Sequence, residues 1–152
     1  MTTKSRDLVK LDLWYTSIYE LGKTGVNLLD YQDMSEIFES HIEFKPRSLE
    51  KRFVKDGQNA NCLTDHLYCA VQPSGSDLYE NGSFMIGEDT ITPDEIVNQN
   101  LRELCVHDSL FPLFKSHWFR YMHDLMEKCL IVEVGGNKKL AKITEECHDE
   151  VI

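Results

Sequence analysis

The segment "CLTDHLYC" at 62–69 places two cysteines, an Asp–His pair and a tyrosine within eight residues. Cys62, His66 and Cys69 are all good zinc ligands, and their C-x3-H-x2-C spacing would let them converge in a loop or on a helical turn. A structural zinc site has four ligands, and Cys105 and His107 are the nearest candidates for the fourth. If the segment is a strand, these side chains cannot all point one way. The segment could therefore hold a zinc site, a metal clip, or its cysteines could simply be buried in the core. Burial in the core is the commoner outcome for cysteines.

The same segment holds residue types that a metal-dependent nuclease needs. In ββα-metal nucleases an acidic or histidine residue ligates a divalent ion, the following histidine acts as general base on water, and a later Asn or His completes the site. Asp65 and His66 fit the first two roles, and Asn81 or Asn137 fits the third. The cofactor would be a divalent metal, magnesium or zinc. An Asp–His dipeptide is common by chance, so a satisfied histidine at the edge of a polar strand is the alternative.

A third group of candidates lies in "HWFRYMH" at 117–123. Its two histidines are six residues apart, which separates them in angle on a helix, so one metal ion would not bind both. The aromatic residues between them continue an apolar stripe at helical spacing. We predict Trp118, Phe119 and Tyr121 to be core residues, and any exposed share of them to be a partner-binding hot spot.

The elements that must position these residues alternate between helical and irregular segments. Apolar residues recur at spacings of three and four in "DLVKLDLWYTSIYELGKTG" and again, with Met34, Ile37 and Phe38 inward, in "YQDMSEIFESH". This pattern predicts a helical hairpin over about 7–41. Glycines and short apolar runs predict an irregular region with strands over 43–91, which includes a basic patch, "KPRSLEKRF".

Helical signals return after this region. Thr92, Pro93 and Glu95 form the start of a helix, since Thr and Glu at this spacing make a capping box. Further helices and the strand "CLIVEV", followed by a "GGN" turn, complete 92–143, and we expect the tail 144–152 to be exposed or frayed. The sum is a single α+β domain over 1–152, helix-rich, with a small antiparallel sheet.

Composition narrows the class of protein. The chain has 152 residues, 41% hydrophobic and 28% charged, which is ordinary for one globular domain. Its formal charge of −10 opposes non-specific binding to nucleic acid and suits a partner with a basic surface. No apolar run is long enough to span a bilayer, and the first residues lack an apolar signal segment. The five cysteines are then expected to be reduced thiols or metal ligands, and the protein to be cytoplasmic.

The order of several short segments resembles small accessory proteins of tailed bacteriophages, some of which are related to HNH or recombination endonucleases. The matching pieces are "IYELGKTGV", "LEKRF", "TDHLY", "CLIVEV" and "NKKL". The resemblance implies that Asp65 and His66 occupy the "DH" position and Asn137 the late Asn. The chain departs from the pattern by a polar insert, "SGSDLYENGSFMIGEDTITPDE", and by lacking a clear last metal ligand.

Two functions follow as expectations. The first is an acidic, phage-encoded interaction protein that binds and modulates a host or viral protein in the host cytoplasm, as an inhibitor or in host takeover. The second is an HNH-like, metal-dependent DNA endonuclease centred on Asp65 and His66, with nucleic acid as its partner. Whether the protein is an enzyme is open at this point, and neither function involves a membrane.

Overall fold

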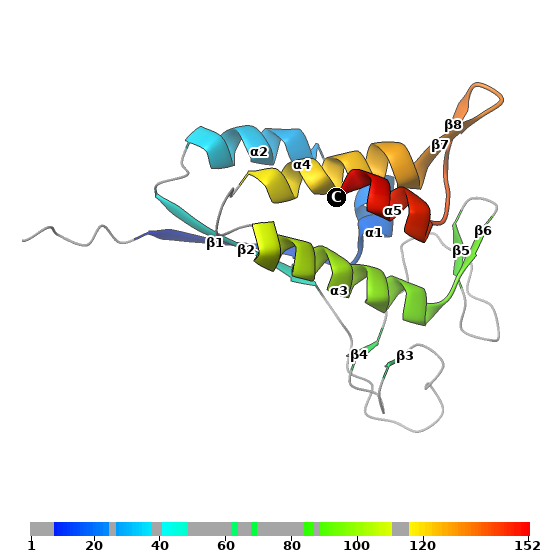
Figure 1. Cartoon of the computed structure of the whole chain (residues 1–152), viewed down its shortest axis with the longest axis horizontal. Helices are drawn as coiled ribbons and strands as arrows, with labels where there is room; N and C mark the ends of the chain where they lie inside the picture. Colours follow the sequence, from blue (N-terminus) through cyan, green and yellow to red (C-terminus); the bar gives the residue numbers. More distant parts are fainter. Residues whose placement is uncertain are drawn as a thin grey trace, which may run out of the picture.

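A computed structural model describes residues 8–24, 27–37, 41–48, 62–63, 68–69, 84–86, 89–110 and 116–152. These residues form an α+β domain rich in helix, which confirms the predicted fold class (Figure 1). Within these ranges the strands form pairs rather than one sheet: β1 with β2, β3 with β4, β5 with β6, and β7 with β8. The first pair is parallel and the other three are antiparallel. The elements in chain order are β1 (Val9–Tyr15), α1 (Ile18–Thr24), α2 (Leu28–Ile37), β2 (Ile42–Ser48), β3 (Cys62–Leu63), β4 (Tyr68–Cys69), β5 (Phe84–Ile86), β6 (Asp89–Ile91), α3 (Pro93–Leu110), α4 (His117–Leu125), a π-helical turn η2 (Met126–Leu130), β7 (Ile131–Val134), β8 (Asn137–Leu140) and α5 (Glu145–Val151).

Strand β1 corrects the prediction of a helix that starts near residue 7. The segment pairs along its whole length with β2, from Val9 opposite Ile42 to Tyr15 opposite Ser48. Its sequence carries two periodicities at once, because apolar residues also alternate with Lys10 and Asp12. Pairing with a distant strand therefore decides between the two, as tertiary contacts commonly override local preference.

Helix α2 also differs from its prediction. It begins at Leu28, after Asn27 accepts a 3.2 Å hydrogen bond from the Leu29 N–H group. Met34 is 43% exposed and Ile37 is 73% exposed, so the predicted inward face points to solvent instead. The helix buries Leu28 and Ser35. Phe38 lies outside the described residues.

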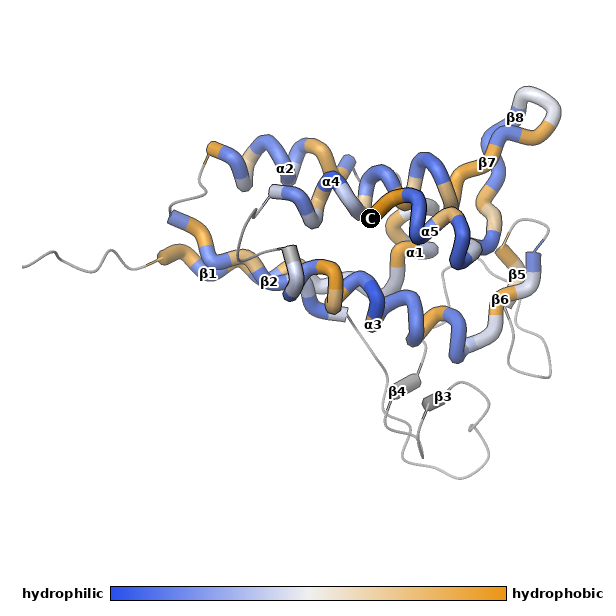
Figure 2. Tube along the Cα trace, viewed as in Figure 1, coloured by the Kyte–Doolittle hydropathy of each residue, from blue (hydrophilic) through white to orange (hydrophobic). Residues whose placement is uncertain are grey.

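The core forms where α4 packs between α2, α3 and the β1–β2 pair. Trp118, Phe119, Met122 and Leu125 of α4 are at most 1% exposed. The ring of Phe44 on β2 lies 5.5 Å from that of Trp118 and 4.5 Å from that of Phe119. Hydrophobic and hydrophilic residues both lie along each surrounding helix, as Figure 2 shows.

Two local predictions are confirmed. At the start of α3 the Thr92 N–H group donates to the Glu95 carboxylate at 2.7 Å, and the Glu95 N–H group donates to the Thr92 hydroxyl at 3.3 Å. Between β7 and β8 the chain turns at Gly135 and Gly136, whose φ angles are 60° and 79°. Glycine adopts positive φ without the steric cost that other residues meet.

The tail forms helix α5 and is therefore not frayed, although most of residues 144–152 are exposed, as expected. Thr144 caps α5 by accepting a 3.2 Å hydrogen bond from the Cys147 N–H group. The His148 side chain is 6% exposed, and a disulfide joins Cys147 to Cys129. The short, charged segment forms a helix because one covalent bond and one buried side chain fix it to the core.

Candidate ligand groove between β2 and α3

The residues predicted for a metal clip or nuclease are only partly described. Cys62 and Cys69 lie directly opposite each other in the β3–β4 pair, whereas Asp65 and His66 lie outside the described residues. Asn137 is exposed and begins β8, next to the hairpin turn. Cys105 and His107, the candidates for a fourth zinc ligand, lie on opposite sides of α3, one exposed and the other buried. In the described part of the chain no group of three or more His, Cys, Asp or Glu residues could hold a metal ion.

The three aromatic residues of α4 are in the core. Trp118, Phe119 and Tyr121 are 0%, 1% and 5% exposed. The Trp118 indole N–H group donates to the main-chain carbonyl of Glu103 at 3.0 Å, and the Tyr121 hydroxyl lies 3.0 Å from the Nε2 atom of His148. A partner could reach these side chains only by displacing neighbouring elements. These three side chains therefore do not form an exposed partner-binding surface.

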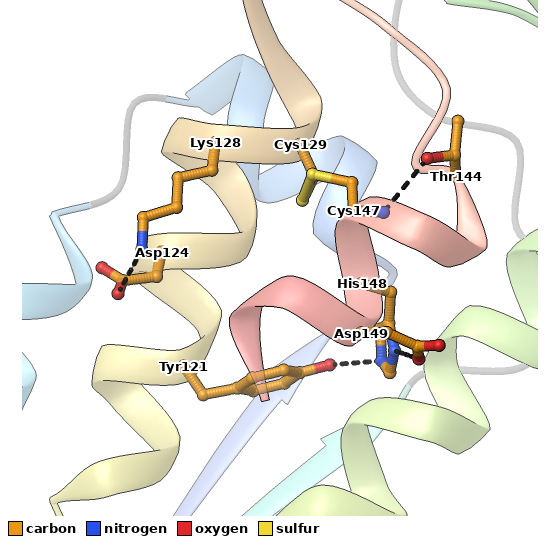
Figure 3. Close-up of a disulfide and its surroundings, with 8 residues drawn as sticks. All are labelled: Tyr121, Asp124, Lys128, Cys129, Thr144, Cys147, His148 and Asp149. Atoms are coloured by element: carbon orange, nitrogen blue, oxygen red, sulfur yellow. Dashed lines mark hydrogen bonds and ion pairs between the residues drawn. A yellow bond between two sulfur atoms is a disulfide. The ribbon is translucent and has the colours of Figure 1, made fainter.

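The disulfide between Cys129 and Cys147 corrects the prediction of reduced thiols. Their Cα atoms are 5.7 Å apart, and the bond links η2 to α5 (Figure 3). The next residue of α5, His148, contacts Tyr121 of α4. Cys129 is buried as half of a cystine. No local pattern indicates this pairing, because the two cysteines are 18 residues apart.

The candidate functional site is a groove of about 570 Å³, which we call the β2–α3 groove. Strand β2 supplies one side and α3 the other, with Trp14 of β1 at the rim. The apolar lining has two exposed members, Trp14 at 60% and Leu101 at 42%. The groove is lined by Trp14, Lys45, Pro46, Arg47, Ser48, Leu101, Leu104, His107 and Asp108.

The alternation of side chains between the two faces of the β1–β2 pair determines where the charged residues of the groove lie. Phe44 and Pro46 are buried on the inner face, so Lys45 and Arg47 project from the outer face. Arg47 forms a 3.0 Å ion pair with Asp12, and Lys45 forms a 3.3 Å pair with Glu43. All four side chains are at least one third exposed, and such pairs contribute little to stability. The two cations can therefore exchange these partners for an anionic ligand at small cost.

His107 forms the inner end of the groove. Burial lowers the pKa of its imidazole, although hydrogen bonds with Asp108 and the main chain of Phe44 act in the opposite direction. The ring therefore stays neutral near pH 7 and adds no charge to the groove. It packs edge-on against Phe44, with the ring centroids 5.6 Å apart.

A buried carboxyl group fixes the inner face of α3. Glu103 is 0% exposed, and its Oε1 atom accepts a 3.2 Å hydrogen bond from the Gln99 amide. Burial raises the pKa of Glu103 to about 8, against smaller opposing effects of hydrogen bonds from Gln99 and Tyr15. Glu103 is thus mostly neutral at pH 7 and connects α3 to β1 and, through its main-chain carbonyl, to α4. This network holds the α3 wall of the groove in place.

The spacing of the cysteines differs from that of dithiol oxidoreductases. The sequence contains no Cys-x-x-Cys pair, which is the spacing of dithiol oxidoreductases. Cys105 is exposed on α3, while Cys129 and Cys147 are joined to each other. The groove itself contains no thiol among its lining residues. The apolar and charged side chains of this lining can bind a ligand.

Comparison with known proteins identifies the family. A family model described as the vacuolar sorting receptor thioredoxin-like domain matches residues 9–152. No curated protein and no solved structure matches the chain. The family match overturns the resemblance to bacteriophage accessory proteins, and the predictions of a phage-encoded interaction protein and of an HNH-like endonuclease are wrong. Every helix in the described part of the chain is too short or too polar to cross a membrane. The match covers all the described elements, and the chain belongs to the family of vacuolar sorting receptor thioredoxin-like domains.

Proposed function

We propose that this domain binds protein cargo for sorting to the vacuole, and that the β2–α3 groove receives a segment of that cargo. The single observation that carries the proposal is the exposed Trp14 indole beside two exposed cations in a groove. Exposed aromatic side chains in a concave site are typical binding hot spots. The family supports the direction of the proposal, because a sorting receptor must bind what it sorts.

The chemistry of the groove indicates the kind of segment that binds. Trp14, Leu101 and Leu104 offer an apolar surface, and Lys45 and Arg47 offer positive charge beside it. A peptide with an apolar side chain next to an acidic one satisfies both parts. The formal charge of the whole chain is −10, which opposes an acidic peptide, so the two exposed cations make this groove a favourable place for it.

Intrinsic fluorescence provides the test, because the two tryptophans of the chain differ in exposure. Trp118 is 0% exposed, so a ligand in the groove should change the emission of Trp14 alone. We expect an acetylated, amidated peptide with a central Leu–Glu pair to change the emission in a saturable and salt-sensitive way. A matched Leu–Lys peptide should bind more weakly, and Arg47→Glu should reverse the preference. Equal responses to the two peptides would contradict the proposal.

We also propose that the domain works in an oxidising compartment, the lumen of the secretory pathway, in place of the cytoplasm expected from the sequence. The Cys129–Cys147 disulfide supports this, because structural disulfides persist in oxidising compartments. Rapid alkylation of intact cells, followed by peptide mass spectrometry, tests it. Both cysteines should escape the alkylating reagent, whereas labelling of both would place the domain in the cytosol.

A further inference from the structure

The outer edge of β1 differs from the outer edge of β2. On β2, Pro46 has no N–H group to offer, and His107 contacts the main chain of Phe44, so this edge is blocked. On β1, the described residues include no strand that pairs with the outer edge. The strand and the residue before it are also unusually apolar for exposed positions: Leu8, Val9, Leu11 and Trp14 are 44%, 65%, 37% and 60% exposed. A long, exposed, apolar edge strand is a site for pairing with another strand.

The direction of the main-chain groups determines which residues can pair there. The Val9 N–H group donates to the carbonyl of His41 at 2.7 Å, so the main chain of Val9 faces β2. The direction of the main-chain N–H and C=O groups alternates from one residue to the next along a strand. The N–H and C=O groups of Lys10, Asp12 and Trp14 therefore face outward, and these residues would exchange hydrogen bonds with an added strand.

We propose that a second copy of this chain occupies the edge, with the two β1 strands antiparallel about a twofold axis at Leu11. In this register Lys10 lies opposite the partner's Asp12, and Asp12 opposite the partner's Lys10. Each of these pairs exchanges main-chain hydrogen bonds, because all four residues direct their N–H and C=O groups outward. A continuous sheet in the order β2, β1, partner β1, partner β2 results.

Charge complementarity selects this register. A shift by two residues in one direction would place Lys10 opposite the partner's Lys10, and a shift in the other direction would place Asp12 opposite the partner's Asp12. Like charges directly opposite each other destabilise a strand pair. The register centred on Leu11 also matches apolar residues, since Trp14 meets the partner's Leu8 and Val9 meets the partner's Leu13.

The stability of the sheet points the same way. The β1–β2 pair already packs against α3 and α4, and a second copy would extend it into a four-stranded sheet. Closed twofold symmetry is also the commonest assembly of like chains, because one patch binds its own copy. The other lining residues of the groove belong to β2 and α3 and stay open in this dimer, whereas Trp14 is shared by the groove and the dimer contact.

Exchanging the charges of Lys10 and Asp12 tests the dimer. Sedimentation equilibrium should show the parent chain as a dimer, and Lys10→Asp or Asp12→Lys alone should raise the dissociation constant roughly tenfold. The double variant, Lys10→Asp with Asp12→Lys, should restore the dimer, because opposite charges again face each other. Lys138→Asp, at an exposed position of β8, makes the same change in net charge as Lys10→Asp and should leave the dimer intact. Thermal unfolding of each variant checks that it is folded.

Cysteine cross-linking tests the register directly. Leu11 meets its own symmetry copy in a non-hydrogen-bonded pair, with Cα atoms about 4.5 Å apart, which a disulfide can span. With oxidised glutathione as the thiol oxidant, Leu11→Cys should form a covalent dimer. Val9→Cys should not, because Val9 lies opposite Leu13. A monomeric parent chain, a double variant that stays monomeric, or equal cross-linking of the two cysteine variants would overturn the proposal.

Discussion

Replacing Glu103 with glutamine should remove a pH-dependent loss of stability from the domain. Burial raises the pKa of the Glu103 carboxyl from 4.5 to about 8. Below pH 4.5 the carboxyl group is protonated in both the folded and unfolded states, so it does not lower the free energy of unfolding. Between pH 4.5 and 8 the unfolded chain loses this proton while the folded chain keeps it. The free energy of unfolding therefore falls as pH rises through this window.

The size of the effect follows from the shift. One pH unit corresponds to about 1.4 kcal/mol. The roughly 2.5 units between pH 4.5 and pH 7 therefore amount to about 3 kcal/mol of lost stability at pH 7. Glutamine keeps the shape of the side chain and can still accept the hydrogen bond from Gln99, but it never ionises.

Urea unfolding of the parent and Glu103→Gln at several pH values measures the effect. The difference between their free energies of unfolding should increase by about 3 kcal/mol in favour of the variant from pH 4.5 to pH 7. Other titrating groups, including His107, are present in both proteins and cancel in this difference. Glu133→Gln, at an exposed position of β7, is the matched control and should show no such trend. A difference that stays constant over this range would refute the reasoning.

Three further predictions concern stability. Replacing both Cys129 and Cys147 with serine should lower the free energy of unfolding by about 3 kcal/mol, because a closed loop of 18 residues no longer restricts the unfolded chain. Urea unfolding measures this loss, and an unchanged midpoint would contradict the prediction. Thr92→Ala should cost about 1 kcal/mol in thermal unfolding by removing the cap of α3, and Thr92→Ser should cost less. Gly136→Ala should cost about 1 kcal/mol because its φ is +79°, and no loss of stability would show that the turn can relax.

Local signals in the sequence were sufficient where neighbouring residues decide the structure. The Thr92–Glu95 capping box and the Gly135–Gly136 turn depend on contacts within a few residues, and both were predicted. The apolar stripe of α4 was also visible as a periodic pattern, because most of that helix face is buried.

Contacts between distant segments determined what the sequence did not reveal. Strand β1 satisfies helix and strand periodicities alike, and only its partner β2 decides between them. Glu103 looks like an ordinary charged helix residue until α4 and β1 enclose it. The groove joins β1, β2 and α3, so no spacing rule could have assembled it from one segment.

The attachment of α5 has a mechanical consequence. A force applied at the end of α5 could unwind only the residues that follow Cys147, because the Cys129–Cys147 bond then carries the load covalently to η2. The load then passes into α4, which is continuous with η2 and carries the ring cluster of the core. Extension from this end would therefore have to disrupt the core itself, and the domain would resist it as one unit until the disulfide is reduced.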